Sequence, residues 1–198
     1  MDRSKLKKLG FLWVFAIGIS VLPIGAAREA SAQARHVRWD IIFFNSTFTG
    51  FFPGGSLSAT AVDGSQITLT GTGTFVQPAS GTGTSNAVTG GGTWATNSPS
   101  AQGTYTVVGF VQYAEAPGTL AGTGLTDGIG DLNDTHAGLG ILSILYSDGE
   151  RGILVLSCNL IGTPSIVYEG ASATKGFVNY FAPVLPGDPN ANMFHFED

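Results

Sequence analysis

Two apolar runs surround a short polar turn in G-I-L-S-I-L-Y-S-D-G-E-R-G-I-L-V-L-S-C-N-L-I-G, residues 140–162. Asp148-Gly149 marks the turn, because this dipeptide readily supplies the positive φ angles of a tight hairpin loop. Both runs are apolar at almost every position instead of at alternate ones, which is typical of strands covered on both faces. We therefore predict a β-hairpin at the centre of a sheet.

The rest of the chain predicts more strands and no long helix. Glycine supplies 26 of residues 33–198, while the usual surface helix formers Lys, Glu and Gln are scarce. Apolar and β-branched runs predict strands over 39–44, 57–62, 66–76, 104–114, 166–168 and 176–181. Asp63-Gly64 predicts the turn of a second hairpin, and the tail from Pro183 is predicted to be loop.

Gly-Thr pairs recur in the middle of the chain, at 71–74, 81–84, 90–93 and 103–106. A spacing of about ten residues fits successive strands of a meander and also the coils of a β-helix. Threonine ranks on a flat sheet are also compatible with ice binding, although Thr on the solvent side of a strand is the ordinary explanation. We predict an all-β, single-domain antiparallel barrel of about eight strands, or a two-sheet sandwich. Such a barrel would enclose a small apolar cavity.

The first 32 residues have the pattern of a secretory signal peptide. A positive segment precedes an apolar stretch over residues 11–24, and Ala30-Ser31-Ala32 has the small-x-small pattern of a cleavage site. An uncleaved anchor is the alternative, but the apolar run is short and contains Pro23. We predict a secreted or periplasmic protein whose single all-β domain spans residues 33–198, without a membrane anchor after cleavage.

The net charge of the predicted domain restricts the class of partner that it can bind. Residues 33–198 carry four basic and twelve acidic side chains, a formal charge of −8 with neutral His. A protein that binds nucleic acid neutralises phosphates with clustered Lys and Arg, and this chain has almost none. We therefore predict no nucleic-acid partner.

The densest polar cluster is T-D-G-I-G-D-L-N-D-T-H, residues 126–136. Asp127, Asp131, Asn133 and Asp134 are hard oxygen donors of the kind that Ca²⁺ accepts, and they are the candidate metal ligands. They do not match the D-x-D-x-D-G pattern with a distal Glu. Asp and Asn also stabilise turns and begin short helices, so a structural loop is the alternative. No other cofactor is predicted.

His136 ends this cluster and is the candidate acid or base. A neighbouring carboxylate, Asp134 or Asp131, would orient its imidazole and raise the pKa, so Asp131, Asp134 and His136 are the candidate catalytic residues. His36 and His195 lie near the two ends of the predicted domain without polar neighbours that suggest a site.

Three other side chains suggest chemistry less directly. Cys158 lies in an apolar strand, where a small buried thiol is the ordinary interpretation. Glu115 and Glu169 interrupt or end apolar runs, and two carboxylates at short distance would permit glycoside hydrolysis. The chain lacks a G-x-S-x-G elbow, an H-E-x-x-H helix, a P-loop and a dinucleotide fingerprint.

Several stretches together resemble uncharacterised secreted all-β proteins of environmental bacteria: G-T-G-T-F, G-G-G-T-W, G-T-Y-T-V-V-G-F-V-Q-Y, A-P-G-T-L, Y-S-D-G-E-R-G-I-L-V-L-S-C and K-G-F-V-N-Y-F. That resemblance implies bacterial export and no particular activity. The Gly-rich strands are also loosely similar to dirigent and allene oxide cyclase-type barrels. No site residue follows from either resemblance.

Two functions remain open from the sequence. The first is an exported binding or structural module whose ligand is a small apolar molecule or a carbohydrate. The second is a small secreted enzyme with its site at a barrel mouth, where His136 works with Asp134 or Asp131.

Overall fold

The structure is a computed structural model that describes residues 34–81, 83–184 and 189–197, so the predicted leader lies outside it. Its described part is almost entirely β-structure, and none of its helices is long and apolar enough to cross a membrane. The elements are β1 (Arg35–Phe44), β2 (Gly50–Pro53), β3 (Leu57–Thr60), β4 (Gln66–Leu69), β5 (Thr72–Gln77), β6 (Val88–Asn97), β7 (Ser100–Ala116), β8 (Thr126–Asp127), the 3-10 turn η1 (Leu132–Asp134), β9 (Thr135–Tyr146), β10 (Arg151–Cys158), β11 (Gly170–Lys175), β12 (Val178–Tyr180), β13 (Ala182–Pro183) and β14 (Asn190–Glu197).

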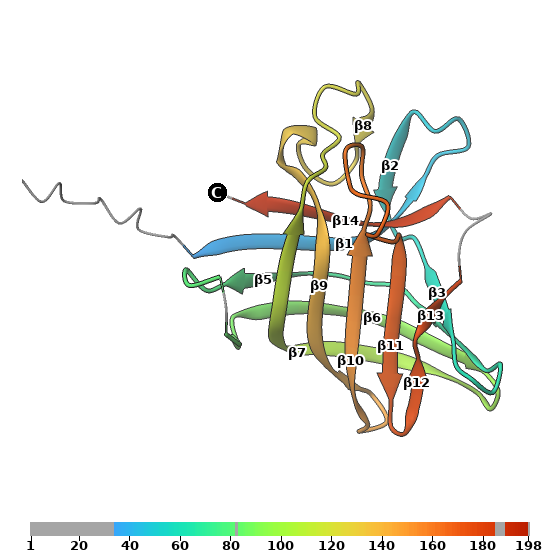
Figure 1. Cartoon of the computed structure of the whole chain (residues 1–198). Helices are drawn as coiled ribbons and strands as arrows, with labels where there is room; N and C mark the ends of the chain where they lie inside the picture. The colour runs from blue at the N-terminus through green and yellow to red at the C-terminus, as the bar shows by residue number, and fades with distance from the viewer. Residues whose placement is uncertain (1–33, 82, 185–188, 198) are drawn as a thin grey trace, which may run out of the picture. The chain divides into compact units, whose positions relative to one another are not determined.

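Six antiparallel strands close into a ring in the order β1, β5, β6, β7, β9 and β14, and β14 returns to β1. In Figure 1, β1 and β14 run across the view while β7 and β9 run up it. The predicted antiparallel barrel is therefore confirmed, with six strands in the ring instead of about eight.

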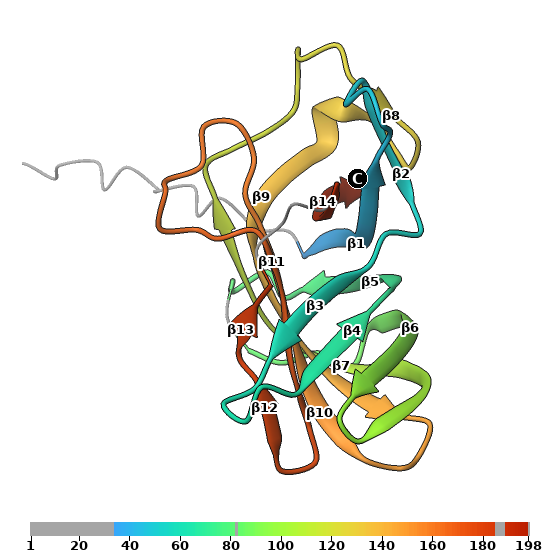
Figure 2. The ribbon, with the colours of Figure 1, turned by 90° about the vertical axis from the view of Figure 1, so that its right-hand side faces the viewer.

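Six of the remaining strands extend two sides of the ring, while β2 pairs with β1 and with β8. β10, β11 and β12 continue the sheet outward from β9, and β4, β3 and β13 continue it from β6. Figure 2 shows these extensions as two layers, and β3 lies against β11. Sheet-on-sheet packing of this kind lets the outer strands bury one face each.

The hairpin that the sequence predicts is formed by β9 and β10. Leu142 faces Leu154 in the register, and the Tyr146 amide donates to the Glu150 carbonyl across the turn. β9 also pairs with β7 along its other edge and with β14 at its start, so it is central as predicted. Coverage differs from the prediction, because the described residues bury the face that carries Leu142 and Leu154 but leave most side chains of the opposite face half-buried.

The prediction of a loop after Pro183 is wrong, because this part of the chain contains the strand that closes the ring. Residues 190–197, N-A-N-M-F-H-F-E, form β14, which inserts between β1 and the start of β9. Asn192 and His195 interrupt the apolar pattern that would predict a strand. The groups that bind these two polar side chains come from distant parts of the chain, so the sequence does not reveal them.

Two other strand predictions also need correction. Residues 166–168 form a turn, in which the Val167 amide donates to the Pro164 carbonyl. The predicted strand over 66–76 divides into β4 and β5, since it breaks at Thr70 and Gly71 while both halves pair with β6.

Aromatic side chains fill the ring where the sequence predicted a cavity. Phe75 stacks on Phe110 with centroids 4.8 Å apart, and the Tyr113 and Phe194 rings meet edge to face at 5.0 Å. Gly140 makes room for this cluster, because a Cβ there would lie only 3.1 Å from the Phe194 ring. Packed aromatic side chains therefore hold this part of the ring interior together.

The Gly-Thr pairs have a packing reason in this ring. A Cβ on Gly71 would lie 2.9 Å from two carbons of the fully buried Trp39 ring, so glycine allows the indole to pack directly on the backbone. The threonines face away from the core, and the hydroxyls of Thr74 and Thr89 bond across the strands at 2.8 Å. This antiparallel arrangement is that of the predicted meander.

Phe194→Ala should destabilise the fold by about 3–5 kcal/mol, because it removes a fully buried aromatic ring at the strand that closes the barrel. Urea unfolding followed by tryptophan emission measures the change. Ile166→Ala, at a side chain 88% exposed, is the control and should change stability by less than about 0.5 kcal/mol. Similar losses in the two variants would contradict the closing role of β14.

Candidate functional site

Asp127 is the one predicted candidate that becomes buried. Its Oδ1 accepts from the backbone amides of Ile129 and Gly130 at 2.8 and 2.9 Å, as Asp does in a tight turn. Its Oδ2 lies 2.8 Å from Nε2 of His195, and the two side chains are only 4% and 3% exposed. Asp127 thus connects the polar loop to β14.

His195 was not predicted as a site residue, because its partner Asp127 lies 68 residues away in the chain. Its side chain stands opposite Arg38 in the β1–β14 register and beside the Phe51 ring, with centroids 6.4 Å apart. Gly130 covers it from the loop, and Nδ1 is buried without a hydrogen-bond partner among the described residues. The Asp127–His195 pair is closed to solvent, so its geometry supports loop attachment rather than catalysis.

A second buried carboxylate lies on the same side of β1. Asp40 is 1% exposed and accepts from Arg38 Nε at 2.8 Å, from Arg38 Nη2 at 3.2 Å and from Thr72 Oγ1 at 2.6 Å. Asp40 is the main cause that raises the Arg38 pKa, and Glu197 and Asp127 add to it. The bidentate Arg38–Asp40 pair lies within β1 and keeps the buried negative charge neutralised, while the Thr72 hydroxyl joins Asp40 to β5.

Asp131 and Asn133 hold the short η1 turn. Oδ1 of Asp131 accepts from the backbone amide of Asn133 at 2.9 Å and from its side-chain amide at 2.8 Å. The structure thus contains the capping arrangement that was the sequence alternative. Asp134 is exposed at the end of the same turn.

The four candidate metal ligands do not converge. Both oxygens of Asp127 face partners inside the protein, whereas Asp131 binds Asn133. Within residues 34–81, 83–184 and 189–197, no group of three or more His, Cys, Asp or Glu side chains could hold a metal ion. Ca²⁺ binding therefore gains no support from the loop geometry.

His136 has a carboxylate neighbour, but it is Glu115. Nδ1 of His136 lies 3.3 Å from Oε1 of Glu115, whose Oε2 accepts from Arg35 Nη1 at 2.5 Å. The Phe196 ring stacks on the imidazole with centroids 3.5 Å apart, and the Arg35 guanidinium lies 4.3 Å from the same ring. Arg35, Glu115, His136 and Phe196 come from four ring strands, and we call them the ring-end cluster.

The ring-end cluster is half-exposed, with side-chain exposures of 28% for His136 and 42% for Glu115. Burial lowers the pKa of His136, and Arg35 lowers it further, whereas Glu115 and Asp134 act in the opposite direction. A neutral imidazole beside a carboxylate can accept a proton from a bound molecule. Asp134 acts on His136 only as a nearby charge, and Asp131 is occupied by Asn133.

Glu169 lies in a different place from Glu115. Its oxygens accept from the backbone amides of Asn192 at 2.6 Å and Asn159 at 2.7 Å, so it holds β14 and the end of β10. Burial raises its pKa to about 7 despite these hydrogen bonds. Burial also raises the pKa of Cys158 well above its ordinary value, which makes that thiol unreactive.

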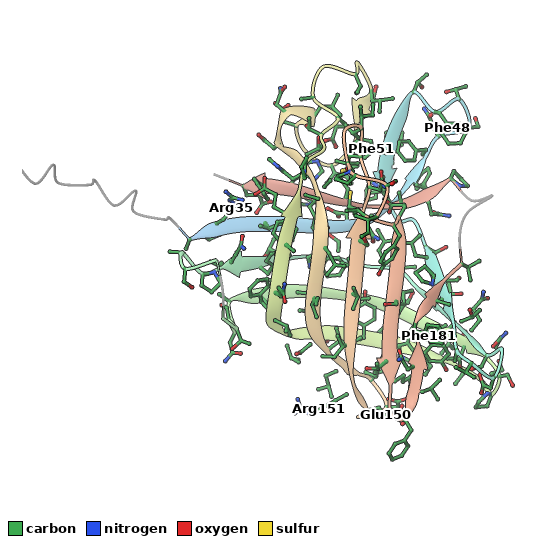
Figure 3. All side chains as sticks on the ribbon, in the orientation of Figure 1. Arg35, Phe48, Phe51, Glu150, Arg151 and Phe181 are labelled. Carbon is green, nitrogen blue, oxygen red and sulfur yellow. The ribbon has the colours of Figure 1, made fainter. Side chains whose placement is uncertain are left out.

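Two grooves flank Phe177, which the sequence analysis included in a predicted strand. The structure instead leaves this side chain fully exposed, just before β12. A groove of about 410 Å³ is lined by Ala61, Val62, Asp63, Phe177, Val178, Asn179 and Phe181. A second groove of about 260 Å³ is lined by Trp94, Thr96, Pro99, Ala101, Glu150, Lys175, Phe177, Val178 and Tyr180. Phe181 and Glu150 mark this end of the molecule in Figure 3.

Lys175 organises the floor of the smaller groove. Its ammonium lies 4.4 Å from the Trp94 ring centroid and 5.1 Å from that of Tyr146, and it forms ion pairs with Asp148 and Glu150. Cation–π and ionic contacts together keep this long side chain in place. The groove floor is therefore ordered before any ligand arrives.

Comparison with family models, with curated proteins and with solved structures gives no match for this chain. The resemblances noted from the sequence stay predictions.

Glu169 should make the protein less stable as the pH rises. Its pKa is about 7 in the folded chain against 4.5 ordinarily, so between these values the folded state binds more protons than the unfolded state. This contribution is complete below pH 4.5 and is lost by about pH 8, which should lower the free energy of unfolding by about 3 kcal/mol.

Denaturant unfolding at several pH values, with Glu169→Gln as the control, measures this effect. The lowered pKa of His136 acts in the opposite direction but is present in both proteins. The difference between the two curves therefore isolates Glu169. An unchanged pH slope in Glu169→Gln would show that this carboxyl is not the cause.

Millimolar Ca²⁺ should leave the thermal midpoint unchanged, because Asp127 and Asp131 already bind groups of their own loop and of β14. A ligand that binds only the folded state would raise the midpoint. Differential scanning fluorimetry with Ca²⁺ and with Mg²⁺ checks this, and a rise specific to Ca²⁺ would restore the metal site.

Proposed function

We propose that the chain is an exported binding module that takes a ligand with an apolar surface in the grooves beside Phe177. The observation that carries the proposal is the position of Phe177, a large aromatic side chain fully exposed between two grooves. Exposing an aromatic ring to water is unfavourable, so such a ring at a groove is typical of a contact surface.

The chemistry of the larger groove favours a small apolar molecule. Val62 and Phe181 are strongly exposed there, and together with Phe177 they form an apolar wall. Asp63 and Asn179 provide the polar groups that can orient a bound molecule. The volume of about 410 Å³ lies in the usual range for a small ligand.

A carbohydrate is the other ligand class that these grooves suit. The CH face of a sugar ring can pack against an aromatic side chain, and its hydroxyls can bond to nearby carboxylates and amides. Phe177 provides the ring, while Asn179 and Glu150 provide polar groups on its two sides. The acidic balance of residues 33–198 supports neutral or apolar ligands over nucleic acid.

Export is part of this proposal. It is supported by the positive, apolar and small-x-small segments of residues 1–32. Secretion and periplasmic location remain equally compatible with that pattern.

The alternative function is a small enzyme at the ring-end cluster. The observation that favours it is the 3.3 Å approach of His136 to Glu115 at the exposed end of the ring. A panel of p-nitrophenyl esters and glycosides tests it: turnover that is lost in both His136→Gln and Glu115→Gln, and kept in Asp134→Asn, would replace binding by catalysis as the proposed function.

Phe177→Ala should weaken binding of the apolar probe 8-anilinonaphthalene-1-sulfonate at least fivefold, because it removes the wall shared by the two grooves. Dye fluorescence during titration measures the affinity. Maltohexaose is the carbohydrate probe, and emission from Trp94, which lines the smaller groove, should change if it binds there.

Phe48→Ala is the matched control, since Phe48 is also an exposed phenylalanine and lies on the loop between β1 and β2 (Figure 3). The control should bind both probes as the parent protein does. Equal binding by Phe177→Ala and the parent would refute the groove as the binding site.

A further inference from the structure

One face of the central sheet is largely aliphatic, and the described residues leave its side chains only half-buried. β7, β9, β10 and β11 lie side by side in Figure 1, and one face of this sheet packs on the core. Half-buried aliphatic side chains occupy the opposite face, and we call them the outer sheet face: Val108, Leu139, Ile141, Leu145, Ile153 and Val155.

Alternation along the strands establishes this orientation. On β9, Leu142 and Ile144 are buried in the core, whereas Ile141 and Leu145 on either side of them are half-buried and outside it. Val155 stands opposite Ile141 in the β9–β10 register. The exposed aliphatic side chains therefore form one continuous surface over neighbouring strands.

The outer sheet face contains almost no charge. Ser143 and Thr174 separate its aliphatic side chains, and among its described positions the charged one is Arg151, at the start of β10 (Figure 3). A shallow groove of about 340 Å³ crosses it, lined by Val108, Ser143, Ile144, Arg151, Gly152, Ile153 and Thr174. Sheets that face water normally alternate apolar inside with polar outside, and this sheet does not.

We propose that the outer sheet face binds the same face of a second copy of this chain. The sequence pattern of β9 and β10 is that of strands covered on both sides, and the fold covers one side. A face without opposing charges is complementary to itself, as a two-fold interface requires. A partner with a charged surface would form few favourable contacts with this face.

The area of the outer sheet face is sufficient for a weak dimer of this chain. Four strands about 4.8 Å apart and seven residues at about 3.4 Å each give a face of roughly 450 Å² in projection. Two such faces in contact bury about 900 Å², which lies in the range of weak, transient interfaces. The expected dimer is therefore weak, with a dissociation constant in the micromolar range.

Net charge opposes this association only weakly. Residues 33–198 carry a formal charge of −8, and the described charged position of the outer sheet face is basic. Salt at physiological strength screens repulsion between exposed charges within about 8 Å. Association should therefore strengthen modestly as salt is added.

Sedimentation velocity from about 1 to 200 µM tests the proposal, a range chosen to span a micromolar dissociation constant. The parent protein should shift toward twice the monomer mass as concentration rises. Ile141→Lys, which brings two like charges together in the dimer, should weaken association at least tenfold. Ile166→Lys makes the same change at an exposed residue outside this face and should leave association unchanged.

Ser143→Lys keeps the test decisive if Ile141→Lys does not fold, because it adds the charge without removing an apolar side chain from the sheet. Phe177→Ala should associate like the parent, so failure of the groove proposal and failure of this one are distinguishable. A parent protein that stays monomeric at every concentration, or association unaffected by both lysine variants, would overturn the proposal.

Discussion

The pairing of β14 with β1 is the interaction on which the rest of this structure depends. Eight residue pairs join the two strands, from His36 with Glu197 to Phe43 with Asn190. Through β14, the first ring strand connects to β9, and the ring closes. Without that closure β1 would have an unpaired edge and β9 would lose its pairing at Thr135 and His136, which is costly in backbone hydrogen bonds and exposes the chain to aggregation.

β14 also divides the polar groups into separate sites. Phe194 and Phe196 point to the inside of the ring, where one packs in the core and the other stacks on His136 at its end. His195 points to the outside and meets Asp127 under the polar loop. The two-residue period of a strand thus places neighbouring residues in two clusters that share no hydrogen bond.

The polar loop illustrates the difference between a dense cluster and a site. Its aspartates lie close in sequence, but Asp127 binds two backbone amides and a distant histidine, Asp131 binds its own turn, and Asp134 is exposed. The apolar surfaces are the opposite case. Phe177 lies in a predicted strand and the outer sheet face lies mainly in the predicted hairpin, yet the fold leaves the first fully exposed and the second only half-buried. Both of our proposals therefore rest on apolar surface that the fold leaves accessible, and neither rests on the polar loop.

Local pattern was sufficient for the β9–β10 hairpin, its Asp148-Gly149 turn and the all-β class, because turn chemistry and side-chain period act over a few residues. It was also sufficient for the turn-forming roles of Asp127 and Asp131. It missed β14 and the Glu115 partner of His136, since those depend on residues that meet only after the ring closes. Tertiary structure alone decided which face of the hairpin is covered, because the same apolar pattern suits a strand packed on its own chain and one packed on another molecule.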